Sequence, residues 1–132
     1  MAFGIIIACS RSEPNLPRDY VTRFIDIDSL DCTTVLVLPE YACIECTRFT
    51  YDLVKEGKPR KNFWIITDDV RFREGKNVII DTEKDRIVRY NPFVSRAYFV
   101  KFRNGRLDVV KSIGSDNLDS LQLIYSSMVQ CP

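Results

Sequence analysis

One short apolar run limits the folds open to this chain more than any other feature. Thr33–Leu38 has the sequence Thr-Thr-Val-Leu-Val-Leu, is rich in β-branched residues and is ended by Pro39. A continuous apolar run of this length is typical of a strand buried on both faces, because a half-buried strand alternates apolar and polar residues. The sequence therefore predicts a central strand of a sheet.

After this strand the pattern changes to helical spacing and then back to a strand. The residues that recur on one helical face are Cys46, Phe49, Thr50 and Leu53. Because Gly57 and Pro59 supply a stop, residues 44–56 are predicted to form an amphipathic helix with Cys46 on its buried side. Residues 62–67 (Asn-Phe-Trp-Ile-Ile-Thr) are a second apolar run. A strand, a helix and a strand normally close as a right-handed parallel crossover.

The remaining sequence predicts an antiparallel half. The expected elements are a flanking strand at 20–27, a charged connection at 68–76 with room for a short helix, a short strand at 77–80, a loop region, strands at 97–102 and 107–113, and a helix at 116–129. Asn104-Gly105 between the last two strands is a strong hairpin signal, because both residues tolerate positive φ. The predicted order is β-α-β, a connection and then β-β-α.

Composition favours one domain and thiol chemistry. A chain of 132 residues is large enough for one well-packed core. Its formal charge is +1, so no overall field recruits nucleic acid. The absence of His from the sequence removes the usual general base and the commonest metal ligand, and leaves Cys as the strong nucleophile near neutral pH. We therefore expect no cofactor, and metal binding ranks last among the roles considered for the cysteines.

Cys43 and Cys46 form a CxxC pair at the start of the predicted helix. Free backbone N–H groups and the helix dipole stabilise negative charge there, so the pKa of Cys43 is expected below the free value of about 8.5. Cys46, one turn further along, is positioned to attack a mixed disulfide on Cys43. The pair is predicted to exchange disulfides, with a static disulfide and a metal site as alternatives.

With this dithiol between a buried strand and a helix, the chain resembles the thioredoxin-like superfamily over roughly residues 33–129. The resemblance implies an α/β, three-layer sandwich, in which a central mixed sheet is flanked by helices, for a domain spanning residues 19–132. It also implies that Cys43 attacks and Cys46 resolves.

The residues around the dithiol differ from those of thioredoxins, which have Gly-Pro between the cysteines and Trp before the first. This chain has Ile44-Glu45 and Ala42 there. The charge of Glu45 is expected to oppose a thiolate and to favour a reducing couple. When the strand and turn at 97–107 are aligned with the superfamily, Arg96 takes the place of its cis-proline. Arg96 is thus a candidate to support a thiolate or a substrate carbonyl, with a solvated loop arginine as the alternative.

Residues 39–46 also have the spacing of the Pro-xxx-Thr/Ser-xx-Cys motif of peroxiredoxins, with Cys43 at the hydroxyl position and Cys46 at the peroxidatic one. The chain resembles that group in a second respect, because Arg96 matches an Arg that supports the peroxidatic cysteine. A thiol in place of the peroxide-binding hydroxyl makes dithiol exchange the favoured activity. Tyr41, beside the motif, is a candidate to line the substrate groove or to cover the end of the sheet.

Residues 3–10 (Phe-Gly-Ile-Ile-Ile-Ala-Cys-Ser) resemble the end of a bacterial lipoprotein signal, in which Cys9 becomes lipid-modified. Residues 1–18 are then a signal remnant and a polar tether. The alternative is a short apolar edge strand or a frayed terminus, since the stretch is too short to span a bilayer. The resemblance implies a lipid-anchored protein of the cell envelope or periplasm.

The function expected from these features is disulfide reduction or exchange with a protein partner outside the cytoplasm. One alternative is a non-enzymatic thioredoxin-fold accessory module whose dithiol is a structural staple, and another is a peroxiredoxin-like peroxidase acting through Cys46. For Cys32 and Cys131, buried thiols that pack as small hydrophobes are the leading expectation, ahead of a structural disulfide or a further exchange partner.

Overall fold

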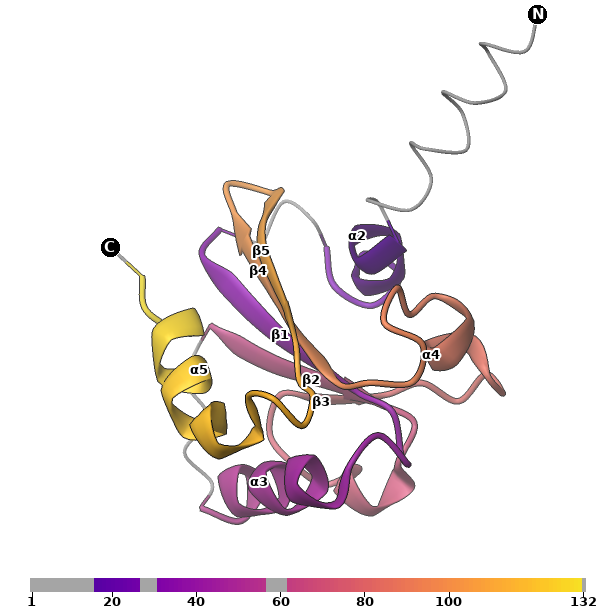
Figure 1. The fold of residues 1–132 in the computed structure, drawn as a ribbon. Helices are drawn as coiled ribbons and strands as arrows, with labels where there is room; N and C mark the ends of the chain where they lie inside the picture. The colour runs from indigo at the N-terminus through magenta and orange to yellow at the C-terminus, as the bar shows by residue number, and fades with distance from the viewer. Residues whose placement is uncertain (1–15, 27–30, 57–61, 132) are drawn as a thin grey trace, which may run out of the picture.

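The computed structural model describes residues 16–26, 31–56 and 62–131, which form a mixed α/β fold around a five-stranded sheet (Figure 1). In chain order the elements are α2 (Leu16–Val21), β1 (Thr33–Leu38), α3 (Ile44–Lys55), β2 (Phe63–Thr67), the 3-10 turn η3 (Val70–Phe72), β3 (Val78–Ile80), α4 (Arg86–Arg89), β4 (Tyr98–Arg103), β5 (Arg106–Ser112), the 3-10 turn η4 (Leu118–Ser120) and α5 (Leu121–Met128). The strand order is β3-β2-β1-β4-β5.

The strand β1 lies in the middle of the sheet, as its apolar run predicts. It pairs in parallel with β2 and antiparallel with β4, and all six of its residues are buried. Its alternate side chains enter different cores, with Leu36 and Leu38 on one face and Val35 and Val37 on the other. The prediction of a strand buried on both faces is confirmed.

Helices cover both faces of the sheet and produce three layers. One core contains Cys46 of α3 and Tyr125 of α5, together with Phe63 of the sheet. The other contains Tyr20 of α2 and Ile87 of α4. Figure 1 shows the two helix pairs on opposite sides of the strands. The chain is therefore an α/β protein with a central mixed sheet, as expected at the level of fold class.

Two predicted pairings are confirmed. The strands on either side of α3, β1 and β2, run parallel. The strands β4 and β5 run antiparallel around Asn104 and Gly105, whose φ angles are 54° and 74°. These positive φ values are the conformation for which the Asn-Gly pair is suited.

The flanking strand expected at residues 20–27 is wrong: residues 20 and 21 end the helix α2, residues 22–26 form a turn and an irregular segment, and residue 27 lies outside the described residues. Tyr20 and Val21 are adjacent and fully buried, and both enter the same core. Consecutive side chains of a strand point to opposite faces, so a strand could not bury both in that core. The helix also includes Leu16 to Arg18, which the sequence assigned to the tether.

Two further segments differ in detail from expectation. The loop region before β4 contains the short helix α4. The last helix, expected over residues 116–129, begins as η4 and continues as α5.

Candidate active site

Cys43 is the N-cap residue of α3. β1 ends at Leu38, and a short loop leads to Cys43, whose backbone is extended at φ −165° and ψ 148°. Its Sγ accepts a hydrogen bond from the backbone N–H of Cys46 at 2.9 Å. An acceptor at this position satisfies a free N–H of the first turn and lies where the helix dipole favours negative charge. The predicted position of Cys43 at the helix start is confirmed.

Cys43 and Cys46 form a disulfide, and their Cα atoms are 5.2 Å apart. The surroundings of the two residues differ. Cys46 is 2% exposed and belongs to the core beneath α3, whereas Cys43 lines a surface cavity. Cys43, which is partly buried and lines the cavity, is therefore the cysteine that an incoming group meets first.

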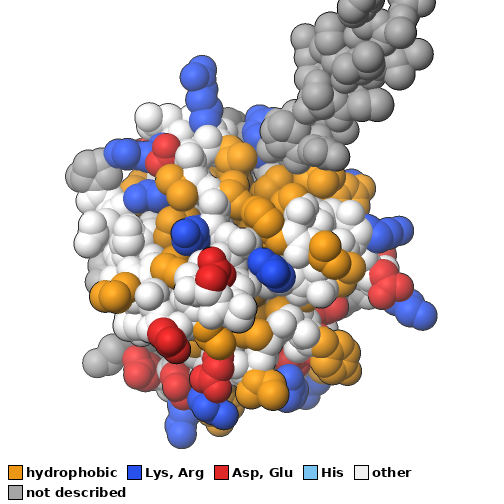
Figure 2. Space-filling model, in the orientation of Figure 1, with side chains coloured by type: hydrophobic (Ala, Val, Ile, Leu, Met, Phe, Trp, Pro, Cys, Tyr) orange, Lys and Arg blue, Asp and Glu red, His pale blue; other side chains and the backbone are white. Residues whose placement is uncertain are grey.

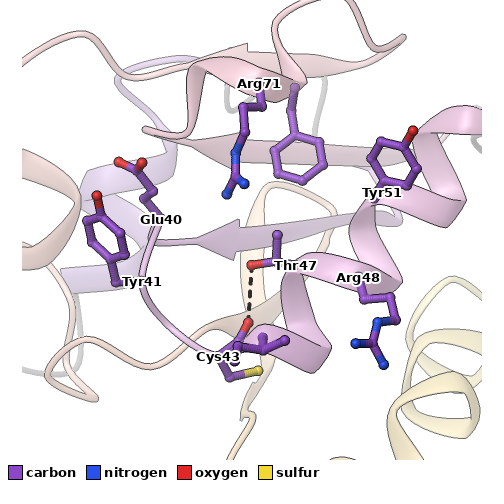
Figure 3. Close-up of a pocket in the computed structure, with 9 residues that line it drawn as sticks. Glu40, Tyr41, Cys43, Thr47, Arg48, Tyr51 and Arg71 are labelled. Carbon is purple, nitrogen blue, oxygen red and sulfur yellow. Dashed lines mark hydrogen bonds between the residues drawn. The ribbon is translucent and has the colours of Figure 1, made fainter.

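The cavity beside Cys43 has a volume of about 600 Å³ and lies between the β1–α3 loop, the outer side of α3 and η3 (Figure 3). Besides Cys43, its lining residues are Glu40, Tyr41, Ile44, Thr47, Arg48, Tyr51, Arg71 and Phe72. Figure 3 shows Tyr41 and Tyr51 at opposite ends, with Arg71 between them. A volume of this size falls within the range of protein ligand sites.

Arg71 is held at this cavity by a forked ion pair with Asp69. Its Nη2 lies 2.6 Å from Oδ2 of Asp69, and its Nε lies 2.9 Å from Oδ1. Asp69 is 1% exposed, and its hydrogen bonds from Arg71 hold the pKa of its carboxyl below the ordinary value. The carboxylate therefore stays charged and fixes the orientation of the guanidinium.

Tyr41 lines the Cys43 cavity, as one of its two sequence interpretations proposed, and its side chain is 89% exposed. Glu45 does not line that cavity. Its Oε1 lies 3.0 Å from Nη1 of Arg48 in an exposed ion pair, and it borders a smaller cavity beside η4. The charge of Glu45 is therefore opposed by a basic neighbour.

Arg96 is exposed and does not line the Cys43 cavity. Its guanidinium lies against Gly114, where a Cβ would approach Nη1 to 3.1 Å. The residue after it, Ala97, is buried in the same core as Cys46. Arg96 thus occupies a loop next to the core beneath the dithiol, with its side chain directed to the turn after β5.

Most residues of the cavity wall were not predicted from the sequence. Ile44, Thr47, Arg48 and Tyr51 recur at i, i+3, i+4 and i+7, the spacing of one helical face. The spacing alone would have revealed this outward face once the helix had been assigned. Phe72 comes from η3, after β2, and no local pattern connects that turn with the dithiol.

A second cavity, of about 550 Å³, adjoins the first and shares Glu40 and Tyr41 with it. It lies at the carboxyl ends of the parallel strands β1, β2 and β3. The acidic residues that line it are Glu40, Asp68, Asp81, Glu83 and Asp85, and the basic residue is Lys84. Asp81 and Glu83 form ion pairs with Arg86. The other three acidic residues form no ion pair within the described chain, so the cavity carries an excess of negative charge.

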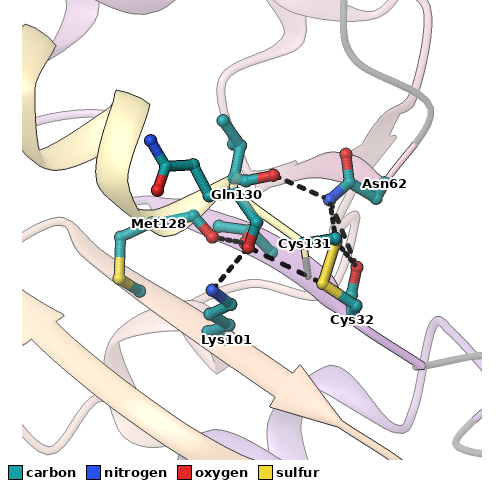
Figure 4. The surroundings of a disulfide bond; sticks show 8 residues. Cys32, Asn62, Lys101, Met128, Gln130 and Cys131 are labelled. Atoms are coloured by element: carbon teal, nitrogen blue, oxygen red, sulfur yellow. Dashed lines mark hydrogen bonds between the residues drawn. A yellow bond between two sulfur atoms is a disulfide. The ribbon is translucent and has the colours of Figure 1, made fainter.

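Cys32 and Cys131 form a second disulfide (Figure 4), so the expectation of buried free thiols is wrong. Cys131 is exposed and Cys32 is partly buried. Nδ2 of Asn62 donates to the carbonyl oxygens of Cys32 and Val129 at 3.2 and 3.0 Å, which links the start of β2 to the same corner. Cys9, the expected lipidation site, lies outside the described residues.

Within residues 16–26, 31–56 and 62–131, no group of three or more His, Cys, Asp or Glu side chains is placed to hold a metal ion. No helix in that part of the chain has both the length and the apolar character needed to cross a membrane. Comparison of the chain with protein-family models, curated proteins and solved structures gives no match. The geometry of the site is therefore the basis for assigning a function.

Proposed function

We propose that this protein is a thiol-disulfide oxidoreductase, in which Cys43 exchanges disulfides with a protein partner and Cys46 completes the exchange. One observation carries the proposal: Cys43 caps α3 and lines an open cavity, while Cys46 is 2% exposed. A static cross-link needs no such asymmetry. An exchange reaction needs one sulfur that a partner can reach and one that attacks only from within.

In the reduced protein, the Cys43 thiolate attacks one sulfur of a partner disulfide. The bond between Cys43 and that sulfur forms as the partner's S–S bond breaks, and the partner's other sulfur leaves as a thiolate. Cys46 then loses its proton and attacks Sγ of Cys43, which forms the intramolecular disulfide and releases the partner's second thiolate. Two electrons have moved from the dithiol to the partner, and an external dithiol reductant returns them.

The hydrogen bond from the N–H of Cys46 supports both steps, because it lies 2.9 Å from Sγ of Cys43. A donor at that distance stabilises Cys43 as the attacking thiolate and as the leaving group in the reverse direction. The ion pair between Arg48 and Glu45 offsets part of the negative charge that would otherwise oppose this thiolate.

The finer fold assignment, a thioredoxin-like domain, belongs to the same proposal. It is supported by a dithiol at the start of the helix that follows the central strand, by parallel β1 and β2 around α3, and by the antiparallel β4–β5 hairpin before α5. Two departures remain. Ile44-Glu45 separates the cysteines, and Arg96 stands where the superfamily has a cis-proline, with no cis peptide bond among the described residues.

We further propose that the protein works outside the cytoplasm, in the cell envelope or periplasm, on a lipid anchor at Cys9. The second disulfide, between Cys32 and Cys131, supports an oxidising compartment, because cytosolic thiols are kept reduced. The anchor itself rests on the sequence of residues 3–10.

The closed Cys43–Cys46 disulfide also suits a structural staple in an accessory module, which is the alternative function. A peroxidase acting through Cys46 has less support, since a peroxide would have to reach a sulfur on a residue that is 2% exposed.

Insulin reduction by the protein in the presence of dithiothreitol tests the proposal. The wild-type protein should accelerate the reaction above the dithiothreitol background, and Cys43→Ser should abolish the acceleration. Cys46→Ser that is first reduced and then mixed with insulin after removal of dithiothreitol should accumulate a mixed disulfide with the substrate. No acceleration by the wild-type protein, or full activity in both variants, would overturn the proposal. If the wild-type protein is inactive and its Cys43–Cys46 disulfide has a reduction potential below about −300 mV, the disulfide is a structural staple. Peroxide consumption that Cys46→Ser abolishes and Cys43→Ser does not would indicate the peroxidase.

A further inference from the structure

We propose that the site selects polypeptide partners in which a bulky apolar side chain lies beside the reacting cysteine and a Lys or Arg lies further along the segment, across Tyr41. This inference rests on the proposed function, because it names the class of partner that meets Cys43.

Exposed apolar side chains gather around the two cavities. Of eight large hydrophobic side chains that are exposed in the described residues, Tyr41, Ile44 and Tyr51 line the Cys43 cavity, and Val70 and Val88 line the adjoining one. On the face shown in Figure 2, Lys, Arg, Asp and Glu side chains lie among apolar ones. Apolar surface concentrated at a reactive sulfur indicates a surface that a partner covers.

The Cys43 cavity fits an apolar side chain better than a charged one. Its two arginines form ion pairs, Arg71 with Asp69 and Arg48 with Glu45, so part of their positive charge is already neutralised. The remaining wall includes Tyr51 at one end. A volume of about 600 Å³ holds an aromatic or large aliphatic side chain with room for the adjoining backbone.

The adjoining cavity supplies the charge complementarity. Glu40, Asp68 and Asp85 line it and form no ion pair within the described part of the chain. Oδ1 of Asp68 accepts the backbone N–H of Glu40 at 2.8 Å, which fixes that carboxylate in place. A Lys or Arg of the partner would meet this excess of carboxylates with favourable Coulomb energy.

The two cavities lie on the path of a single extended segment, because both are lined by Glu40 and Tyr41. A polypeptide can place an apolar side chain on one side of Tyr41 and a basic side chain on the other. Small acidic thiols such as glutathione carry two carboxylates, which the second cavity would repel. The occupant is therefore a polypeptide segment with adjacent apolar and basic side chains.

Peptide binding to the oxidised full-length protein tests the inference without any redox step. The probe is a fluorescent peptide with Ser in place of each cysteine, Phe beside the first Ser and Lys further along. Replacing Phe by Ala should weaken binding by about tenfold, because the buried apolar area is lost. Replacing Lys by Glu should weaken it by a similar factor at low salt, and by less at high salt.

Surface variants identify which cavity recognises which side chain. Ile44→Ser and Tyr51→Ser should weaken binding of the Phe peptide and leave the Ala peptide unchanged. Leu123→Ser is the matched control, because Leu123 is 72% exposed on α5 and lines neither cavity. For the charge, Asp68→Asn/Asp85→Asn should weaken binding of the Lys peptide, whereas Asp108→Asn/Asp119→Asn should not.

Reduction of the corresponding disulfide-bonded peptides separates the inference from the proposed function. If all peptides are reduced at one rate and bind with equal or undetectable affinity, the inference about partners is overturned and the proposed oxidoreductase function is retained. If the protein binds the Phe-Lys peptide selectively but reduces no peptide, the inferred docking surface is supported and the proposed oxidoreductase function is overturned. Selective binding with faster reduction of the Phe-Lys peptide is the expected result.

Discussion

At the scale of single residues, Cys43 and Cys46 have the same side chain but different surroundings. Cys43 Sγ accepts an N–H at the start of α3, and Cys46 lies in the core. In the reduced protein we therefore expect iodoacetamide to modify Cys43 at pH 6, where Cys46 stays unmodified, because the thiolate is the reactive form. Peptide mass spectrometry after timed quenching gives the rates. Cys131 is the internal comparison, since it is exposed but does not cap a helix; equal rates at Cys43 and Cys131 would contradict the prediction.

Asp81 is the best-connected buried carboxylate on the other face of the sheet. It is 3% exposed, accepts the hydroxyl of Tyr20 at 2.6 Å and lies 2.8 Å from Nη2 of Arg86. Tyr20→Phe should lower the free energy of unfolding by about 1.5–3 kcal/mol, because the hydrogen bond is to a charged group. Urea unfolding at pH 7 measures the change. Tyr51→Phe, at a half-exposed tyrosine of α3, should change it by less than about 0.5 kcal/mol.

The same contacts predict how stability depends on pH. Burial raises the pKa of Asp81, but hydrogen bonds from Arg86, Tyr20 and the backbone of Glu83 outweigh it, so the pKa lies below the ordinary value. Such a carboxyl contributes stability that is complete above its unfolded pKa of about 3.9 and is lost as the pH falls through the lower folded value. The loss of unfolding free energy caused by Tyr20→Phe should therefore become smaller as the pH is lowered from 7 toward 2. Urea unfolding at a series of pH values measures it, and a loss that is the same at every pH would refute this coupling.

At the scale of elements, the sequence revealed those elements whose residues signal their own conformation. A continuous apolar run rich in β-branched residues identified β1, helical spacing identified α3, and Asn104-Gly105 identified the hairpin. α2 was missed because six residues are too short to display helical periodicity, and because the aromatic and β-branched residues at 20–27 favour a strand locally. Its contacts with Asp81, 61 residues away from Tyr20, favour the helix and are not encoded locally.

The candidate site likewise contains some residues that local sequence patterns predict and others that only the fold brings in. Cys43 and Cys46 were located by their spacing and by the helix that follows, and Tyr41 by its position beside them. Arg71 and Phe72 enter the cavity from η3 only because β2 lies parallel to β1 in the folded sheet. Contacts of this kind depend on tertiary arrangement, and a local pattern contains no information about them.

The β4–β5 hairpin allows a direct test of its turn. Gly105 has φ 74°, a region in which a Cβ clashes with the backbone, so Gly105→Ala should lower the free energy of unfolding by about 1 kcal/mol. Asn104→Gly is the matched control, because glycine adopts the φ of 54° without strain. Thermal and urea unfolding of both variants measure the difference. An Ala variant as stable as the wild-type protein would show that the turn adopts another conformation.

At the scale of the whole molecule, the residues after α5 are fixed to the start of the sheet. The carbonyl oxygen of Met128 accepts a hydrogen bond from the Thr34 hydroxyl, and that of Gln130 accepts one from Nζ of Lys101 at 2.7 Å. Thr34 satisfies a carbonyl that the end of α5 leaves free, and the charge of Lys101 complements the negative end of the helix dipole. Figure 4 shows the contact of Lys101 with Gln130 beside the Cys32–Cys131 disulfide. The six residues of β1, about 20 Å of strand, separate this corner from the dithiol.

The Cys32–Cys131 disulfide closes a loop across a sequence separation of 99, whereas the Cys43–Cys46 disulfide spans three. Because a cross-link restricts the unfolded chain more when its loop is longer, Cys32→Ala/Cys131→Ala should lower the free energy of unfolding by roughly 3–5 kcal/mol. Cys43→Ala/Cys46→Ala is the matched control and should cost considerably less. Urea unfolding without reductant compares the two variants, and a single Cys131→Ala should resemble the first double variant. Equal costs for the two double variants would mean that local contacts, rather than the length of the closed loop, determine what each disulfide contributes.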